Sequence, residues 1–428
     1  MIPNEWYAVL ESRDLGSGKP VGIKRFGERL VLWRRPDGGV VCMEDRCAHR
    51  GTALSLGRLD GDRIACAYHG LRYDSTGQCV RIPCSGADAT IPKTMAVRTY
   101  PARDENGFVF VWWGETRETY PAIPWIPEFP ADPRLGRTHS EIWPFNYARL
   151  IESNLDAHHW AFVHGTIMVG VGERMDSFQV EKEERGLRCW GILRRGTSGA
   201  AKVGSEQATW DIQKKTSGWW FRLAFQMPNL NMIQVTPRYR SLVVTTPVDE
   251  FTSWVAVRCY HEYVRLPPLR QMLDFYCVRF LFHVPQYRQD FPIFHSQRPR
   301  HTGVGVNRLV ESDKAIGAYL LLREQAIRKA RGADESEVRD LQHGTWNWQR
   351  NGAPAPAARN GGSPGATVHA IDLDRPLPCM LPDADRNAHV GREKPLGRAL
   401  AWAKNCATFP LLVPSLVICK ALDAFDRI

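Results

Sequence analysis

The sequence predicts an α+β protein in which a β-rich N-terminal domain precedes a larger domain of mixed strands and helices. Residues 1–120 contain short β-branched and aromatic runs separated by Gly, Asp and Pro turns. Helical spacing of apolar residues begins near residue 142 and continues to 165, strand-like runs return at 175–260, and helical patterns dominate 266–331. With a length of 428 residues, these blocks indicate two or three domains.

The boundaries between the expected strands, helices and domains follow from turn and linker residues. Residues 36–39 (Pro-Asp-Gly-Gly) predict a hairpin turn, and five prolines between Pro121 and Pro133 predict an interdomain linker. The helical region after residue 266 is expected in two pieces, broken near 299–305. The expected segments are a β-rich domain at 1–120, the linker at 121–140, a second domain at 141–332, and an extension at 333–428 that includes a flexible Gly/Pro/Ala-rich segment at 351–365.

The composition narrows the class of protein. The formal net charge is +10, but there is no run of five basic residues, so we expect no nucleic-acid partner and either an ordinary mixed surface or an acidic protein partner. The N-terminus lacks the pattern of a signal peptide, and the cysteines number 11, which predicts thiols or metal ligands in the cytoplasm. The apolar stretch 407–419 is too short to span a membrane, and it leaves room for peripheral membrane contact.

A first group of residues has the spacing of a metal site. Its members are two cysteines and two histidines, in the order Cys47, His49, Cys66 and His69. Two thiolates and two imidazoles suit Zn²⁺, and they equally suit a Rieske cluster, in which two His replace two Cys on one iron. Gly51 and Gly70 follow the two pairs and would let the backbone approach the sulfides of a cluster. The spacing alone does not decide between zinc and a cluster.

A second group lies at 152–164 and contains Asp156, His158, His159 and His164. On an ideal helix, side chains five residues apart differ by about 140° in direction. His159 and His164 could therefore face one metal only if the helix ends or distorts between them, and Gly165 is a plausible stop. Asp156 lies three residues before His159, so its carboxylate can hold the non-ligating nitrogen of a histidine.

Both groups resemble one family. Segments 47–57, 60–62 and 66–74 resemble the Rieske domain of ring-hydroxylating oxygenases, and the second group resembles the D-x-x-H-x4-H motif of the same family. Thr52 and Tyr68 stand where respiratory Rieske proteins carry two further cysteines, which favours the oxygenase or ferredoxin branch. The resemblance covers roughly residues 5–325. It is strongest to members with a single type of subunit, such as 3-ketosteroid 9α-hydroxylase, dicamba and vanillate O-demethylases and chlorophyll-pathway oxygenases.

The resemblance implies a Rieske [2Fe-2S] domain followed by a catalytic domain with an antiparallel sheet wrapped around helices, as in a helix-grip fold. The cluster ligands would be Cys47, His49, Cys66 and His69. His159 and His164 would bind a mononuclear Fe(II), with His158 left out. Segment 289–294 resembles the family's Q/E-D-x-x-I segment, which makes Asp290 the expected third ligand, near the first turn of a helix because of Pro292.

Two positions in these motifs leave alternatives open. Asp274 is the runner-up for the third iron ligand, and Asp313 is a weaker candidate. The family often has Asn after the position of Glu152, whereas this chain has Ser153 there and Asn154 one place on, so the role of Asn154 stays open.

The resemblance also implies partners and a reaction. Electrons from NAD(P)H would arrive through a ferredoxin or a flavin reductase, and O2 would be the co-substrate. In a head-to-tail homotrimer, Asp156 would bridge the partner subunit's His69 and His159. The substrate would be an apolar, ring-containing molecule that is hydroxylated, demethylated or similarly oxidised. Phe225, Phe291 and Phe294 are candidate pocket residues, with core packing as the stronger competing explanation for each. The rival classes are a Rieske electron carrier without oxygenase activity and a zinc-stabilised binding module.

Overall fold

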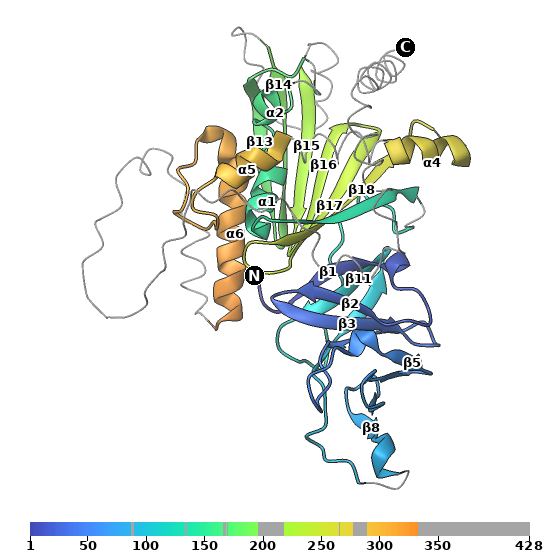
Figure 1. Cartoon of the computed structure of the whole chain (residues 1–428). Coiled ribbons are helices and arrows are strands. Elements are labelled where there is room, and N and C mark those ends of the chain that lie inside the picture. The colour runs from blue at the N-terminus through green and yellow to red at the C-terminus, as the bar shows by residue number, and fades with distance from the viewer. Residues whose placement is uncertain are drawn as a thin grey trace, which may run out of the picture. The chain divides into compact units, whose positions relative to one another are not determined.

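The computed structural model describes residues 1–86, 90–132, 135–165, 168, 170–195, 218–264, 266–276 and 289–332. The chain divides into two compact units, Met1–Trp348 and Gln349–Ile428, and all described residues belong to the first (Figure 1). The expectations for 333–428, which include the flexible segment and the apolar stretch at 407–419, lie outside the described residues.

The N-terminal part of the first unit consists of three small antiparallel sheets (Figure 1). In spatial order they are β1 (Glu5–Glu11), β11 (Phe108–Trp113) and β10 (Ala102–Glu105); β2 (Val21–Arg25), β3 (Glu28–Arg34), β4 (Val40–Glu44) and β9 (Thr99–Tyr100); and β5 (Arg58–Asp60), β6 (Arg63–Ala65), β7 (Arg72–Tyr73) and β8 (Cys79–Arg81). Three 3₁₀ helices join them, η1 (Ser12–Asp14), η2 (Leu54–Leu56) and η3 (Pro83–Ser85). The predicted hairpin turn at 36–39 is confirmed between β3 and β4, where Gly38 has a φ of 86° that favours glycine.

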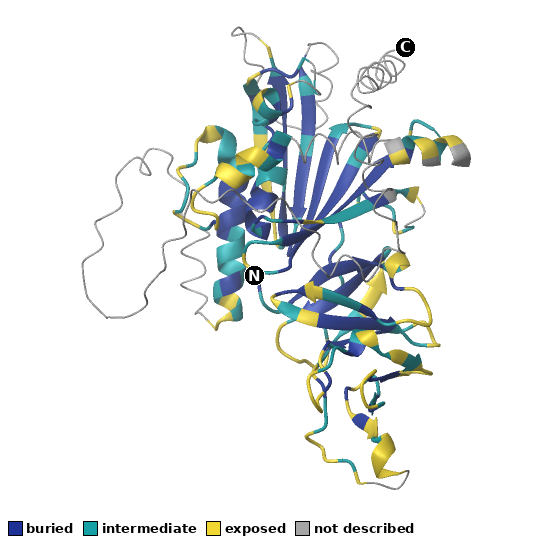
Figure 2. Cartoon of the chain, in the orientation of Figure 1, coloured by how far each residue is buried: buried dark blue, intermediate teal, exposed yellow. Residues whose placement is uncertain are grey.

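The second part is built on a seven-stranded antiparallel sheet. Its spatial order is β12 (Arg137–Trp143), β18 (Ser253–His261), β17 (Tyr239–Pro247), β16 (Leu230–Thr236), β15 (Trp219–Gln226), β14 (Gly186–Arg194) and β13 (Arg174–Glu183). Successive side chains on a strand point to opposite faces. Val255 and Val257 therefore belong to a core beneath the helices, whereas Ala256 belongs to a core shared with Trp6 and Phe110 of the N-terminal sheets. Because both faces are covered, the central strands are buried, as Figure 2 shows in dark blue.

Helices cover one face of this sheet. They are α1 (Tyr147–Asn154), α2 (Trp160–Val163), α4 (Pro267–Tyr276), α5 (Phe291–Ser296) and α6 (Lys314–Ala330), with the 3₁₀ helix η7 (Glu311–Asp313) preceding α6. Helix α1 packs on β16 and β17, α6 packs on β13 and β14, and α4 packs on β12 and β18. The predicted architecture, a β-rich domain followed by a sheet with helices on it, is confirmed.

The helix expected at 142–165 is wrong at its beginning. Trp143 is the last residue of β12 and pairs with Ser253. The physical reason is Pro144, because a residue that precedes proline favours an extended backbone. The break expected near 299–305 is confirmed, since no helix occurs at 297–310, all of which the structure describes.

Candidate metal centres

Two loops at the end of the N-terminal part repeat one backbone pattern. In the first, the Cys47 N–H donates to the Thr52 carbonyl (2.8 Å) and the Gly51 N–H donates to the Cys47 carbonyl (2.9 Å). In the second, Cys66 and Gly70 make the same two bonds at 2.8 and 3.0 Å. Both glycines have a left-handed backbone, with φ of 75° and 69°, which other residues rarely adopt. The two loops therefore place their cysteines in equivalent positions, whereas His49 follows its cysteine by two residues and His69 by three.

The four side chains converge with sulfur inside and imidazole outside. Cys47 and Cys66 are only 3% and 2% exposed, whereas His49 and His69 lie on the exposed tip of the domain. The two histidine Nδ1 atoms are 3.2 Å apart. Burial raises the pKa of the Cys66 thiol, so a positive metal is needed beside it to hold the thiolate. This donor set fits a group with a thiolate-ligated buried iron and an imidazole-ligated outer iron.

Tyr73 contacts the first of these loops from the core. Its Oη accepts a hydrogen bond from the Ala48 N–H (3.2 Å), so the hydroxyl proton can be donated to Cys47 Sγ, which lies 3.1 Å away. Tyr73 is fully buried. We did not expect a role for Tyr73 from the sequence; the signal would have been its place directly after the second ligand loop.

We expect Tyr73→Phe to lower the reduction potential of the cluster. A hydrogen bond to a ligand sulfur stabilises the reduced, more negatively charged state, and its loss favours the oxidised state. A redox titration followed by EPR measures the shift. Tyr100→Phe is the matched control, since the hydroxyl of Tyr100 bonds Glu28 instead. Equal potentials in the Tyr73 variant and the wild type would show that the hydroxyl does not tune the cluster.

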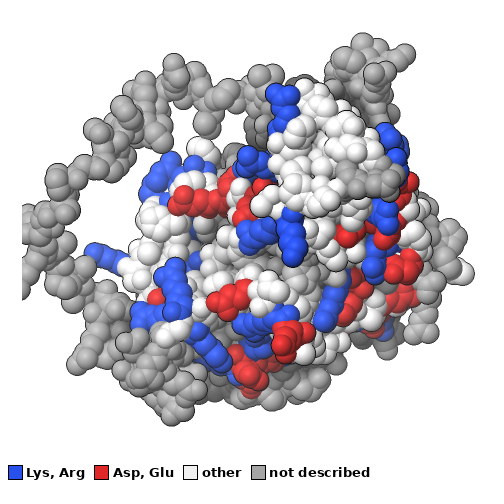
Figure 3. Space-filling model, turned by 90° about the horizontal axis from the view of Figure 1, so that it is seen from below, with Lys and Arg blue, Asp and Glu red and all other residues white. Residues whose placement is uncertain are grey.

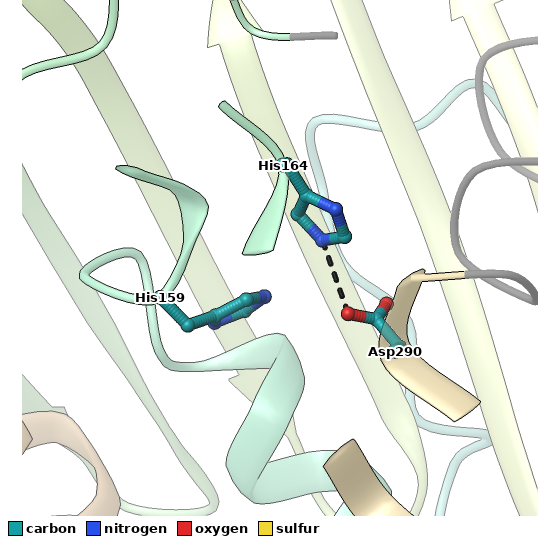
Figure 4. A group of neighbouring side chains, drawn as sticks. All are labelled: His159, His164 and Asp290. Atoms are coloured by element: carbon teal, nitrogen blue, oxygen red, sulfur yellow. Dashed lines mark ion pairs between the residues drawn. The ribbon is translucent and has the colours of Figure 1, made fainter. Parts of the chain in front are cut away.

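The second site is arranged around the single turn of α2. His159 precedes this turn and His164 follows it, as its N-cap and C-cap residues, and α1 has already ended at Asn154. The helix end expected between the two histidines falls at Val163, whereas the gap between α1 and α2 precedes both of them. The two imidazole rings lie edge to face, with centroids 5.1 Å apart. Figure 4 shows both rings directed toward the same space as Asp290.

Asp290 completes this group from the N-terminus of α5. Pro292 occupies the first turn of that helix, as expected from the sequence. One ligand atom from each of His159, His164 and Asp290 lies within 4.8 Å of the others. Asp290 Oδ1 is 3.2 Å from His164 Nε2, yet this buried oxygen makes no hydrogen bond within the described residues. A buried carboxylate oxygen without such a bond fits a metal ligand.

The Asp156 carboxylate positions the imidazole ring of His159. Its Oδ2 lies 3.2 Å from His159 Nδ1, and its Oδ1 accepts the backbone N–H groups of His158 (2.8 Å) and His159 (3.3 Å). Burial alone would raise the pKa of Asp156, but the contacts with His159 outweigh it and the net shift is downward. The carboxylate therefore stays ionised and directs His159 Nε2 toward the metal position.

Gln289 holds His164 in the corresponding way, since its Oε1 lies 2.8 Å from His164 Nδ1. This residue was missed as a functional residue from the sequence. The available signal was its position next to Asp290. Two histidines whose outer nitrogens each have a fixed partner form a preorganised metal site.

The other sequence candidates lie apart from this group. His158 Nε2 is 2.9 Å from the Glu173 carbonyl. Asn154 contacts Asn231 (3.5 Å between Nδ2 and Oδ1). Asp274 Oδ1 is 3.0 Å from Nε2 of the buried His261, where α4 meets the sheet. The structure therefore brings Asp290, and not Asp274, to the two histidines.

A cavity of about 350 Å³ adjoins the second site. Its lining includes Glu152, Asp156, His159, Asp290, Phe294 and Asp313. Asp313 itself accepts the N–H of Val310 (2.8 Å) rather than contacting a histidine. Of the aromatic candidates, Phe225 packs in the core against Tyr319, with ring centroids 4.9 Å apart. Phe291 packs against Phe145 at 5.1 Å.

Comparisons with known proteins show which class of protein the fold and the donor sets resemble. Residues 5–101 match the family profile described as the Rieske [2Fe-2S] domain. Over part of its length the chain is similar to the oxygenase components of Rieske non-heme iron oxygenase systems, and its domain order and seven-stranded sheet match their fold.

Three comparisons give the particular relatives. Protein TIC 55, chloroplastic, of Pisum sativum is 35% identical over 196 residues, which are 44% of this chain and 34% of that protein. The oxygenase component of dicamba O-demethylase of Stenotrophomonas maltophilia is 32% identical over 169 residues, 38% of this chain and 48% of that one. The solved structure of dicamba monooxygenase bound to dicamba has a TM-score of 0.54 at 21% identity and covers 78% of this chain and 98% of its own. The chain thus spans less than half of either curated relative, and the solved structure supports the fold.

Proposed function

We propose that the chain is the oxygenase component of a Rieske non-heme iron system, which uses O2 to oxidise an apolar, ring-containing substrate. The observation that carries this proposal is the presence of two separate donor sets in one chain. An electron carrier needs the Cys47, His49, Cys66 and His69 set alone. The second group of His159, His164 and Asp290, with two imidazoles and an unsatisfied carboxylate oxygen, fits the facial triad of a non-heme iron that activates O2.

Each donor residue would have a distinct part in holding the two groups. The two cysteines and two histidines of the first set would hold a [2Fe-2S] cluster, with His69 exposed for electron exchange. His159, His164 and Asp290 would hold Fe(II) and leave three positions open. When bound, these groups supply one-electron transfer and O2 activation. The protein orients the imidazoles through Asp156 and Gln289, and Phe294 offers an apolar contact in the adjoining cavity.

The proposed electron route runs from NAD(P)H through a ferredoxin or flavin reductase to the cluster. In a homotrimer, Asp156 would then join the partner subunit's His69 to His159. Two features support this route: His69 is exposed, and Asp156 lines a cavity while bonding His159. The face seen in Figure 3 carries Lys and Arg interspersed with Asp and Glu. This pattern fits an electron donor that docks through individual ion pairs rather than on one large basic patch.

The proposed location is the cytoplasm. Among the residues that the structure describes, no helix is both long and apolar enough to cross a membrane. Peripheral membrane contact through the C-terminal residues stays part of the proposal, and a flotation assay with and without residues 396–428 tests it.

Oxygen uptake coupled to product tests the proposed activity. The purified chain, a surrogate reductase and NADH are offered a panel of apolar ring compounds, and O2 consumption and product are followed together. We expect a member of the panel to give product in proportion to O2, and His164→Ala to abolish it. Reduction and reoxidation of the cluster without product from any compound would favour an electron carrier.

A further inference from the structure

Two consecutive residues each contact one ring nitrogen of His164. Gln289 Oε1 lies 2.8 Å from His164 Nδ1, and Asp290 Oδ1 lies 3.2 Å from His164 Nε2. Both residues lie in the turn that leads into α5, so the backbone of that turn fixes them together. His164 is buried, which leaves its ring little freedom to rotate.

The chemistry of Gln289 decides which nitrogen of His164 can bind a metal. An amide oxygen accepts hydrogen bonds and cannot donate them. Beside Oε1, His164 Nδ1 must carry a proton, so Nε2, which faces Asp290, is the nitrogen left to bind a metal. The Asp156 carboxylate has the same effect on His159, except that it is charged whereas the amide of Gln289 is neutral.

We propose that Gln289 is a positioning residue of the iron site, which fixes the Nε2 lone pair of His164 toward the metal and, being neutral, keeps His164 a weaker donor than the carboxylate-backed His159. This inference rests on the proposed mononuclear iron site and adds a residue to it. Four carboxylates already line the adjoining cavity, those of Glu152, Asp156, Asp290 and Asp313, and Glu152 is paired with Arg149 at 3.1 Å. A neutral partner for His164 limits the negative charge around the iron and so favours the ferrous state that binds O2.

Metal affinity provides a measurement that does not depend on turnover. The mononuclear iron is removed with a chelator under conditions that keep the visible absorption of the cluster, and Co(II) is titrated into the protein by calorimetry. Gln289→Leu removes the acceptor at similar volume, and we expect the Co(II) dissociation constant to rise about 10–100-fold. Gln289→Glu restores the acceptor and adds charge, so it should bind Co(II) at least as tightly as the wild type. It should also lower the Fe(III)/Fe(II) potential of the reconstituted site.

Gln226→Leu is the matched control. This amide lies on β15 and donates to the Arg185 carbonyl (3.1 Å), away from the cavity that adjoins the iron site. Its replacement should leave Co(II) affinity unchanged.

The outcomes separate this inference from the proposed function. Failure of the wild-type chain to bind Co(II) or iron at a second site would contradict the proposed function. Binding by the wild type that is unchanged in Gln289→Leu would overturn the inference alone. Weaker Co(II) binding by Gln289→Glu than by the wild type would also overturn the inference, because the hydrogen-bond acceptor is then present and the affinity is still lost. The measurement on the Glu variant decides the question even where the Leu variant does not fold.

Discussion

Asp156→Asn is expected to keep both iron centres and to lower substrate oxidation about 100-fold. In the structure, one carboxylate oxygen accepts two backbone N–H groups and the other lies 3.2 Å from His159 Nδ1. An asparagine has one acceptor and one donor group in place of the two acceptors. Its amide N–H must therefore face either His159 Nδ1–H or the backbone donors, and the charge that stabilises His159 during electron transfer is lost.

A single-turnover experiment locates the defect. The variant is reduced, loaded with iron and substrate, and mixed with O2, and oxidation of the cluster is followed by its absorption. We expect slow cluster oxidation with full iron occupancy. Asp249→Asn, at a surface aspartate that pairs with Lys24, is the control and should react as the wild type does. Wild-type rates in Asp156→Asn with both irons present would refute the bridge, and loss of the mononuclear iron would assign Asp156 to iron binding instead.

Cys66→Ala is expected to abolish the visible colour of the protein while most of the chain stays folded. The alanine methyl group cannot ligate iron, and a [2Fe-2S] cluster needs all of its protein ligands. Most of the chain should stay folded because the apolar core beneath the helices contains no residue of the two ligand loops. Circular dichroism should show the strands retained, while absorption and acid-labile sulfide should both be lost.

Cys79→Ala is the matched control for this variant. Cys79 is buried in the same small core as Cys47 and Cys66, but its thiol donates to the Arg81 carbonyl and it lies outside both ligand loops. The control should remain brown. A brown Cys66→Ala protein would remove Cys66 from the ligand set.

Much of the fold could be predicted because the hydrophobic pattern is local. Strand-like runs at 175–260 predicted the region that forms β13 to β18, and a Pro-Asp-Gly-Gly segment predicted the turn between β3 and β4. The prediction of a helix was wrong for the first residues of 142–165, because the apolar spacing near Trp143 suits either a helix or a strand. Pro144 and the pairing of β12 with β18 decided in favour of the strand.

The candidate sites also contain some residues that the sequence could predict and others that it could not. Residues close in sequence, such as His159 and His164, could be grouped from their spacing. Their angular separation on an ideal helix predicted that the helix ends between them, and α2 does end at Val163. The contact of His164 with Gln289 joins residues 125 positions apart. The choice between Asp290 and Asp274 likewise depends on how α4 and α5 pack, because Asp274 is the partner of His261. Such contacts are set by tertiary packing and leave no periodic signal in the sequence.

Iron and sulfide quantitation with EPR on the intact, anaerobically purified chain tests the central claim most directly. The account predicts about three irons and two sulfides per chain, with the signal of a reduced Rieske cluster and a separate high-spin ferrous centre. About two irons, all of them in the cluster, would contradict the oxygenase assignment, and zinc without sulfide would contradict both centres.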